Sequence, residues 1–369
     1  MNVCIIGEGL TALSLAKSLI NKKINVHYYH KNGNGNFSSN RTIGISKSNF
    51  EFFKEKIFLI SKNNYWKINR IEIYTDKIDT DKIDTENLLK FENDKNDLFY
   101  IIKNDELLKS LKSNLIKSKF FKKIILKKDI NEESLNKKKY DLIINCDANN
   151  FLAKKHFTKK ISKNYYNLAY TTIFKHKKIE NNTATQIFTK QGPIAFLPIS
   201  NTETSVVYSI DIKNKKFDNS DVIDLINKNN PKYKINKIDK LNCFELSSSN
   251  LRNYHHKNIL AFGDMLHKVH PLAGQGFNMT IRDLRILTKI IDDKIELGIQ
   301  LDSLVLDEFE KKTKDKNFVF SKAIDLIYET FNLDKKVQSK SLSKILKVIG
   351  KNKKLNNYFI KLADTGINF

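Results

Sequence analysis

The sequence predicts an α/β fold with α+β elements: a Rossmann-like nucleotide-binding domain interleaved with a mixed-sheet domain, followed by a helical C-terminal region. Three observations predict it. A strand, a glycine turn and a helix follow one another at residues 3–20, a second strand and glycine turn lie at residues 258–287, and strand-like runs fill much of the chain between them. Because the two glycine turns are nearly the whole chain apart, we expect separated segments to assemble the nucleotide-binding domain.

The first element is a short apolar run that suits a buried strand and leads into a helix whose apolar positions recur at helical spacing. Between them, Gly7 permits a tight turn and Gly9 lets backbone N–H groups approach a pyrophosphate. Ala12 is small enough for the helix to pack closely on the strand. The helix N-terminus then faces the anion, which predicts a dinucleotide site.

The second strand, Ile24–Tyr29, is followed by His30. An acidic residue normally stands there and holds the adenosine ribose of the dinucleotide. A neutral imidazole can accept one hydrogen bond where a carboxylate accepts several. His30 is therefore a departure from the usual pattern at a position that is still expected to contact the cofactor.

The later segment supplies the other half of the site. Its strand ends in Gly263 and Asp264, and a carboxylate at the C-terminal end of a strand lies where open α/β sheets bind ligands, so Asp264 can accept from a sugar-like hydroxyl. A loop at Pro271 then leads to a second helix start, whose positive potential would stabilise negative charge on a reduced flavin ring. The residues of this turn are Gly274, Gln275, Gly276, Phe277 and Asn278.

These motifs together resemble a known family. Strand-Gly-Asp, His-Pro and Gly-Gln-Gly-x-Asn, with the N-terminal Gly-x-Gly-x-x-Ala, are similar to the flavoprotein aromatic hydroxylases of the p-hydroxybenzoate hydroxylase type. Within that family the chain most resembles the ubiquinone-biosynthesis branch, the polyprenylphenol and methoxyphenol hydroxylases. Supporting stretches lie at residues 41–46, 192–198 and 306–317, so the resemblance runs almost from end to end.

The resemblance implies an FAD-dependent monooxygenase that uses NAD(P)H and O₂ to hydroxylate a polyprenylated phenol. It implies a phosphate or ribose contact for Arg41, which could also be an ordinary surface cation. It places Asp147 where the family carries an Asp-Gly pair for flavin and nicotinamide handling, with Ala148 in place of glycine; alanine there is strained if the position needs φ > 0. Phe196 and Pro198 would line a ring-shaped pocket, although core packing explains them nearly as well. No catalytic acid or base is identified.

The predicted domains are discontinuous. Segments 1–75, 95–155 and 245–295 form the FAD-binding domain, segments 76–94 and 156–244 form the substrate sheet, and residues 296–369 are helical. The fingerprint begins at residue 7 and no apolar run approaches the roughly 20 residues that span a bilayer, so we expect a cytoplasmic protein. His267 and His270 have HxxH spacing but no third ligand nearby, so no metal site is expected.

A formal net charge of +24 raises the question of partners. Nearly all the basic excess is lysine and no nucleic-acid-binding motif is present, so nucleic acid is not expected as a partner. Residues 335–354 combine lysines with apolar residues and contain no acid. This pattern suits the anionic inner face of a membrane, where the chain would bind peripherally, and equally a terminal helix that packs on the core.

Two rival interpretations remain. The chain could be another flavin oxidoreductase on the same scaffold, such as a prenyl-lipid reductase or a halogenase. It could also be a non-catalytic accessory protein of a quinone-biosynthesis complex, which the departures at His30 and Ala148 suggest.

Overall fold

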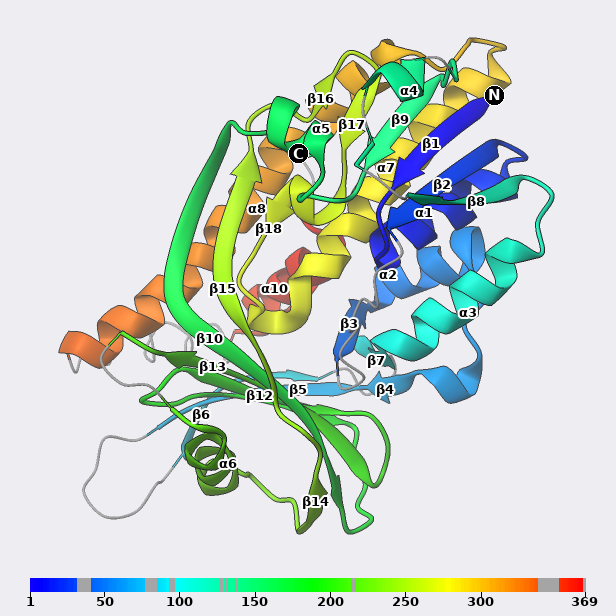
Figure 1. Cartoon of the computed structure of the whole chain (residues 1–369). Helices are drawn as coiled ribbons and strands as arrows, with labels where there is room; N and C mark the ends of the chain where they lie inside the picture. The colour runs from blue at the N-terminus through cyan, green and yellow to red at the C-terminus, as the bar shows by residue number, and fades with distance from the viewer. Residues whose placement is uncertain are drawn as a thin grey trace.

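The computed structural model describes residues 1–31, 41–76, 85–92, 97–126, 129–130, 132–136, 138–213, 217–337 and 352–367. Two large sheets, one parallel and one mixed, share the chain with a three-stranded sheet between them and long helices alongside (Figure 1). The predicted fold class is confirmed. The predicted domain boundaries stay a prediction: β5 and β15, defined below, join the mixed sheet although they lie largely within segments expected in the cofactor domain.

The parallel sheet has six strands in the order β16-β17-β9-β1-β2-β8. All neighbours from β17 to β8 run parallel, and β16 pairs antiparallel with β17. The four residues of β1 after Asn2 are completely buried, as expected for a strand covered on both faces. The strands are β1 (Asn2–Ile6), β2 (Asn25–Lys31), β8 (Phe121–Leu126), β9 (Leu142–Asn145), β16 (His255–His256) and β17 (Ile259–Ala261).

The mixed sheet has nine strands in the order β18-β15-β10-β13-β12-β11-β5-β6, with β14 paired to β10 beside this path. Its pairs are antiparallel except for β11 and β5, which run parallel. The strands are β5 (Arg70–Asp76), β6 (Thr85–Glu92), β10 (Lys160–His176), β11 (Thr183–Phe188), β12 (Pro193–Pro198), β13 (Glu203–Asp211), β14 (Ile235–Ile238), β15 (Asn242–Leu251) and β18 (His267–Lys268). In Figure 1, α6 (Asn219–Lys228) lies below this sheet and α7 (Gln275–Glu296) lies above it.

A small antiparallel sheet joins the two large ones. It consists of β3 (Thr42–Ser46), β7 (Phe99–Lys103) and β4 (Trp66–Ile68), with β7 in the centre. The described helices up to residue 156 are α1 (Leu10–Asn21), α2 (Lys47–Phe52), α3 (Asn104–Ile116), α4 (Glu132–Asn136) and α5 (Phe151–His156). Of these, α1 packs on β1 and β2 and α3 packs on β8, whereas α2 packs on β3 and β7. Single turns of other helix types are η1 (Phe53–Ile57), η2 (Lys62–Asn64), η3 (Gly263–Met265) and η4 (Leu272–Gly274).

In the described part of the C-terminal region the chain forms the helices α8 (Ser303–Val337) and α10 (Lys353–Thr365). Helix α8 packs along α7, whereas α10 packs on α2. Of the basic stretch at residues 335–354, residues 338–351 lie outside the described residues, so the predicted membrane contact stays a prediction. Among the described residues, no helix combines the length and the apolar character that crossing a bilayer requires.

Candidate functional site

The two glycine turns lie against each other. A Cβ placed on Gly263 would stand 2.5 Å from Cγ2 of Thr11, in the first turn of α1, so the backbone at the end of β17 touches the start of that helix. The φ of Gly263 is +71°, a conformation that side chains disfavour. Both steric demands are met only by glycine. Segments separated by about 250 residues of sequence therefore meet at one point, as the sequence predicts.

The start of α1 is open, and its N-cap residue carries no side chain. Gly9 caps the helix without a side-chain hydrogen bond, and the first turn contains no acidic residue. No heavy atom lies within 4 Å of the position that a Cβ on Gly9 would occupy. A Cβ added to Gly7 would meet Cys146 at 3.0 Å and Ala12 at 3.5 Å, so these small residues pack as expected. Exposed N–H groups at such a helix start suit an anion.

The start of α7 is also free of acidic residues, but it is held by a buried clamp. The side chain of Asn278 is completely buried; its Oδ1 accepts from the backbone N–H of Ser46 (2.9 Å), and its Nδ2 donates to the carbonyl oxygens of Gly44 (2.9 Å) and Gly274 (3.0 Å). Asn49 donates a further bond to the same Oδ1. The amide of Asn278 is thus used in positioning α7 on β3. Phe277 instead lies beside the ring of Phe53.

The turn before α7 leaves space next to its backbone. Gly274 has φ +61° and precedes Gln275, whose side chain is buried. No heavy atom lies within 4 Å of the position that a Cβ on Gly276 would occupy, which resembles the open position at Gly9. The two helix starts therefore both present glycine backbone to unfilled space.

Several predicted residues converge at the ends of β2, β9 and β17. Burial is the main cause that raises the pKa of the Cys146 thiol, and the negative charges of Asp264 and Asp147 raise it further. Both carboxylates therefore lie near that thiol. Asp147 accepts from the backbone N–H of Asn149 (2.8 Å), which fixes the turn. Ala148 is not among the described residues with positive φ, so alanine is unstrained there. The side chain of Asp264 is exposed.

His30 offers an acceptor at the end of β2. Its Nδ1 lies 3.0 Å from the carbonyl oxygen of Lys31, an arrangement in which Nδ1–H donates, and its ring stacks on Tyr28 at 5.7 Å between centroids. Burial lowers the pKa of His30, which keeps the ring neutral. Its Nε2 is buried and has no hydrogen-bond partner among the described residues. The lone pair on Nε2 is then available to a hydroxyl, which is the role that the replaced carboxylate would have.

Arg41 lies beside an aromatic ring of the mixed sheet. Its side chain is exposed, and its guanidinium carbon lies 6.0 Å from the centre of the Phe244 ring on β15. This contact neither shows nor opposes the predicted phosphate contact, which stays a prediction.

A small cavity lies between the mixed sheet and the loop that leads into α7. Ala195 of β12 and the loop residues His270 and Pro271 line it, with Gln186, Pro193, Val207, Ser209 and Leu272. Alternation along β12 puts Ile194, Phe196 and Pro198 on the opposite face, where Ile194 and Phe196 pack in the cluster under α6. The structure therefore does not bring Phe196 and Pro198 to this cavity. Sequence reasoning assigns neither His270 nor Ala195 to a pocket, although a small residue between two large ones on a strand indicates a face with room.

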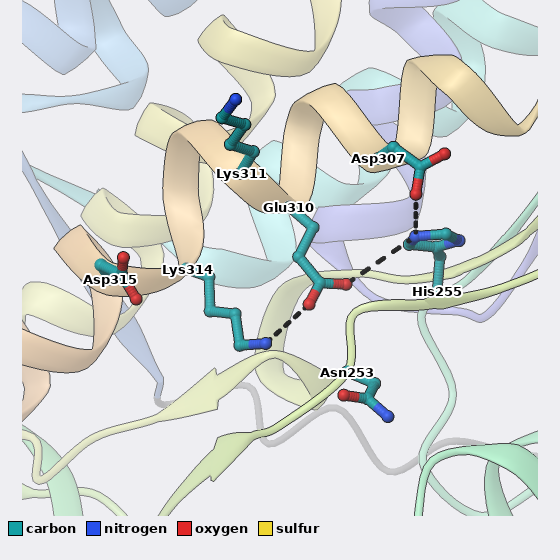
Figure 2. Close-up of a pocket in the computed structure, with 7 residues that line it drawn as sticks. All are labelled: Asn253, His255, Asp307, Glu310, Lys311, Lys314 and Asp315. Atoms are coloured by element: carbon teal, nitrogen blue, oxygen red, sulfur yellow. Dashed lines mark hydrogen bonds and ion pairs between the residues drawn. The ribbon is translucent and has the colours of Figure 1, made fainter.

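Other polar groups are occupied in structural contacts. His267 donates from Nε2 to Asp283 (2.6 Å), both groups being buried, and Asp283 also accepts from Asn317. A surface groove between β16 and α8 is lined by ion pairs: Glu310 lies between His255 and Lys314 (Figure 2). No residue of either glycine turn lines that groove. Among the described residues, no group of three or more potential ligands is arranged to hold a metal ion.

These features fit FAD in chemical terms. A diphosphate requires N–H donors at an uncapped helix start, which α1 supplies at Gly9. A ribose hydroxyl requires an acceptor, which the unpartnered Nε2 of His30 supplies. A ring that becomes negative on reduction requires a second uncompensated helix start, which α7 supplies.

Comparison with known proteins supports the same cofactor. A family model described as "FAD binding domain" matches residues 157–297. The chain is 23% identical to a mitochondrial ubiquinone biosynthesis monooxygenase, COQ6, from Dictyostelium discoideum, covering 89% of this chain and 84% of that protein. The COQ6 protein of Caenorhabditis elegans is 25% identical, but the match covers 42% of this chain and 44% of that one. The 3-demethoxyubiquinol 3-hydroxylase of Escherichia coli (strain K12) is 29% identical over 40% of this chain and 39% of its own length.

Solved structures share the fold over nearly the whole chain. The p-nitrophenol 4-monooxygenase PnpA of Pseudomonas putida DLL-E4 has a TM-score of 0.76 at 13% identity, covering 100% of this chain and 98% of that one. HpxO of Klebsiella pneumoniae, in complex with FAD and uric acid, has a TM-score of 0.74 at 12% identity, covering 99% and 96%. At such identities the likeness concerns the fold. With the curated relatives, it confirms the resemblance predicted from the sequence.

Proposed function

We propose that this chain, which belongs to the FAD-dependent monooxygenases of the aromatic hydroxylase type, hydroxylates the ring of a polyprenylated phenol in ubiquinone biosynthesis. Electrons would come from NAD(P)H and the inserted oxygen from O₂. The observation that carries the proposal is the contact of Gly263 with Thr11, which brings the end of β17 against the start of α1. Helices α1 and α7 each begin without a side-chain cap and with open space beside a glycine. Relatives named for ubiquinone biosynthesis support the choice of pathway.

In this proposal, different residues contact different parts of FAD. Backbone N–H groups at Gly9 and the following residues bind the diphosphate. His30 accepts a hydrogen bond from the ribose through Nε2, and Asp264 accepts from a hydroxyl of the sugar-like chain. The start of α7 faces the flavin ring, and Asn278 keeps it in register with β3. None of these roles requires a nucleophile or an acid–base pair from the protein.

The chemistry belongs to the cofactor. When bound, FAD accepts two electrons from NAD(P)H and supplies them to O₂, so that one oxygen atom enters the ring and the other leaves as water. The chain excludes water and orients the phenol between the mixed sheet and the loop at Pro271, where the small cavity lies.

The proposed substrate suggests where the protein acts and what it contacts. A substrate with a polyprenyl tail resides in lipid, so we place the protein in the cytoplasm at the inner face of a membrane, in contact with a quinone-biosynthesis complex. The basic stretch at residues 335–354 is the predicted contact.

The visible spectrum of the purified protein gives the first test. We expect a yellow protein with bound FAD that oxidises NAD(P)H faster when a prenylated phenol is added. With ¹⁸O₂, one labelled atom should appear in the product, as detected by mass spectrometry. A colourless protein that does not take up FAD would favour the accessory role. FAD-dependent NAD(P)H oxidation without labelled product would favour a reductase.

Complementation in cells separates the pathway from the chemistry. Cells that lack a ubiquinone-biosynthesis hydroxylase should recover quinone when they express this chain, and the intermediate that disappears identifies the ring position. A matched control is the Gly263→Val variant, in which the clash with Thr11 prevents the two halves of the site from meeting. Recovery of quinone with this variant would contradict the proposed site.

A further inference from the structure

His270 is a buried polar residue at the cavity, and the cofactor site does not use its side chain. His270 is 1% exposed and lines the cavity between the mixed sheet and the loop that leads into α7. The ring stacks on Tyr328 at 4.3 Å and meets the edge of Tyr165 at 5.0 Å. These two contacts fix its plane, so its nitrogens have defined positions.

The groups around the His270 ring determine which of its nitrogens carries the proton. The backbone N–H of Leu272 donates to Nδ1 of His270 at 3.2 Å, so Nδ1 acts as the acceptor. Burial first, and then the nearby charge of Lys163, lower the pKa of His270 to about 3, so the ring is neutral at pH 7. A neutral imidazole whose Nδ1 accepts must carry its proton on Nε2. His270, which lines the cavity, thus carries an N–H donor.

Within the described parts of the chain, this donor has no partner. Nε2 of His270 is buried and makes no hydrogen bond to any of the described residues. The two tyrosines around it are satisfied, because Tyr165 donates to Asp325 and the hydroxyl of Tyr328 lies 2.6 Å from the side-chain amide of Asn167. Buried donors are nearly always paired in folded proteins, so an acceptor is expected from a ligand.

We infer that Nε2–H of His270 donates a hydrogen bond to the hydroxyl oxygen of the aromatic substrate, and that this bond selects phenols from arenes that lack the oxygen. The inference rests on the proposed function, because that function supplies the aromatic ring. The lining of the cavity is otherwise neutral, with Gln186 and Ser209 as its other polar side chains. Gln186 already donates from Nε2 to the carbonyl oxygen of Ile194 (3.1 Å).

The place of the loop fits this role. His270 is four residues before Gly274, where the turn into α7 begins, so a phenol held by its oxygen lies next to the proposed position of the flavin ring. The cavity as it stands has room for about one water molecule. A substrate ring therefore enters with displacement of the loop or of side chains on the sheet.

The test compares two ligands on the FAD-loaded protein. 2-Prenylphenol and prenylbenzene differ in the hydroxyl alone, and binding of each is followed by the change in the flavin visible spectrum. We expect the wild-type protein to bind the phenol roughly tenfold more tightly. In His270→Phe, which keeps the stacked ring but has no N–H, the preference should fall to about one- to twofold. In His270→Gln, whose amide can still donate, it should be partly retained.

A control and a second measurement protect the test from folding defects. His256→Phe removes a stacked histidine outside the cavity and should leave the tenfold preference unchanged. In the wild-type protein with ¹⁵N-labelled histidine, the Nε2–H signal of His270 should shift on addition of 2-prenylphenol and not of prenylbenzene. An unchanged preference in His270→Phe, or a proton on Nδ1, would overturn the inference alone. A wild-type protein that carries FAD but binds neither ligand would overturn the proposed function as well.

Discussion

The two helix starts that we propose to hold the cofactor are built in different ways. The start of α1 is open: Gly9 caps it without any side-chain hydrogen bond, and the space beside Gly9 is unfilled. The start of α7 is held from inside by Asn278, whose amide bonds to Gly44, Ser46 and Gly274. The first is shaped to meet an anion, and the second is fixed in place relative to β3.

The difference shows how a site made of distant segments can be precise. Only one half must remain accessible to the diphosphate, while the other must not move when a ring is bound and reduced, since an electrostatic contribution depends on fixed geometry. The joint between the halves is the close approach of Gly263 to Thr11. Substitutions at the joint, at the clamp and at the open positions should therefore have different consequences.

The largest effect is expected at the joint. Gly263→Ala places a Cβ 2.5 Å from Cγ2 of Thr11 and forces alanine to φ +71°. We expect a loss of about 2–5 kcal/mol in the free energy of unfolding, together with loss of FAD, from strain and overpacking. Denaturant unfolding and the flavin absorbance of the purified variant measure both.

Gly298 provides a matched control, because its φ is +69° and no heavy atom lies within 4 Å of the position that its Cβ would occupy. Gly298→Ala should cost about 1–2 kcal/mol, the conformational part alone, with FAD retained. Adding Thr11→Ser to Gly263→Ala removes the clashing methyl group and should restore part of the stability. Equal losses in Gly263→Ala and Gly298→Ala would show that the two turns do not press together.

The clamp should give the next largest effect. Asn278→Asp keeps the shape but turns two donated hydrogen bonds, to Gly44 and Gly274, into contacts between oxygens. We expect a loss of about 2–4 kcal/mol in stability and weaker FAD binding, measured by unfolding and by flavin fluorescence titration. Asn229→Asp, which breaks the bond from Asn229 to Leu225 on α6, should lower stability less and leave FAD affinity unchanged. If both variants bind FAD equally well, Asn278 does not position α7.

A smaller effect is expected at His30. His30→Phe keeps a ring against Tyr28 and loses the acceptor, so FAD affinity should fall about 3- to 10-fold in a fluorescence titration. His30→Glu should raise it, because a carboxylate accepts more hydrogen bonds. His27→Phe, on the same strand but bonded to Tyr140, is the control and should leave affinity unchanged.

The same group predicts a dependence of FAD affinity on pH. Burial lowers the pKa of His30; nearby Lys123 and Lys112 also lower it, whereas Glu8 and the bond to Lys31 raise it. The neutral ring therefore persists to a pH below its usual range, and the acceptor is present above the pKa and lost as pH falls through it. Affinity should decrease in acid in the wild-type protein more steeply than in His30→Phe. If FAD affinity depends on pH in the same way in the wild-type protein and in His30→Phe, His30 does not contact the cofactor.

Much of this organisation could be predicted from sequence where the pattern is local. The turns at Gly7–Gly9 and Gly274–Gly276 are adjacent to apolar runs, and the strand-like runs expected between the two turns include strands of the mixed sheet. The segment of β15 is harder to assign, because its polar run at residues 247–249 does not resemble a strand. It pairs with β10 through backbone groups, for which side-chain polarity gives little guidance.

The parts that depend on distant partners could not be predicted. Apart from Gly274, the partners of Asn278 lie more than 200 residues earlier in the chain, and nothing in its own surroundings identifies them. The contact between Thr11 and Gly263 is equally invisible in either motif alone. The sequence offers Phe196 either as a pocket residue or as core packing, and the alternation of β12 turns Ala195 towards the loop and Phe196 towards α6. Period-two alternation is visible in the sequence, whereas the identity of the face over the loop is not.

The most direct test of the joined cofactor site is Gly276→Ala. Gly276 lies in the first turn of α7 with no heavy atom within 4 Å of the position that a Cβ would occupy, so the added methyl group meets only a bound ligand. Because alanine is favoured over glycine in a helix, we expect the FAD-free protein to be as stable as wild type or up to about 1 kcal/mol more stable. FAD affinity, measured by fluorescence titration, should nevertheless fall about tenfold or more. Unchanged FAD affinity in this variant would contradict the proposal that the cofactor lies against both helix starts.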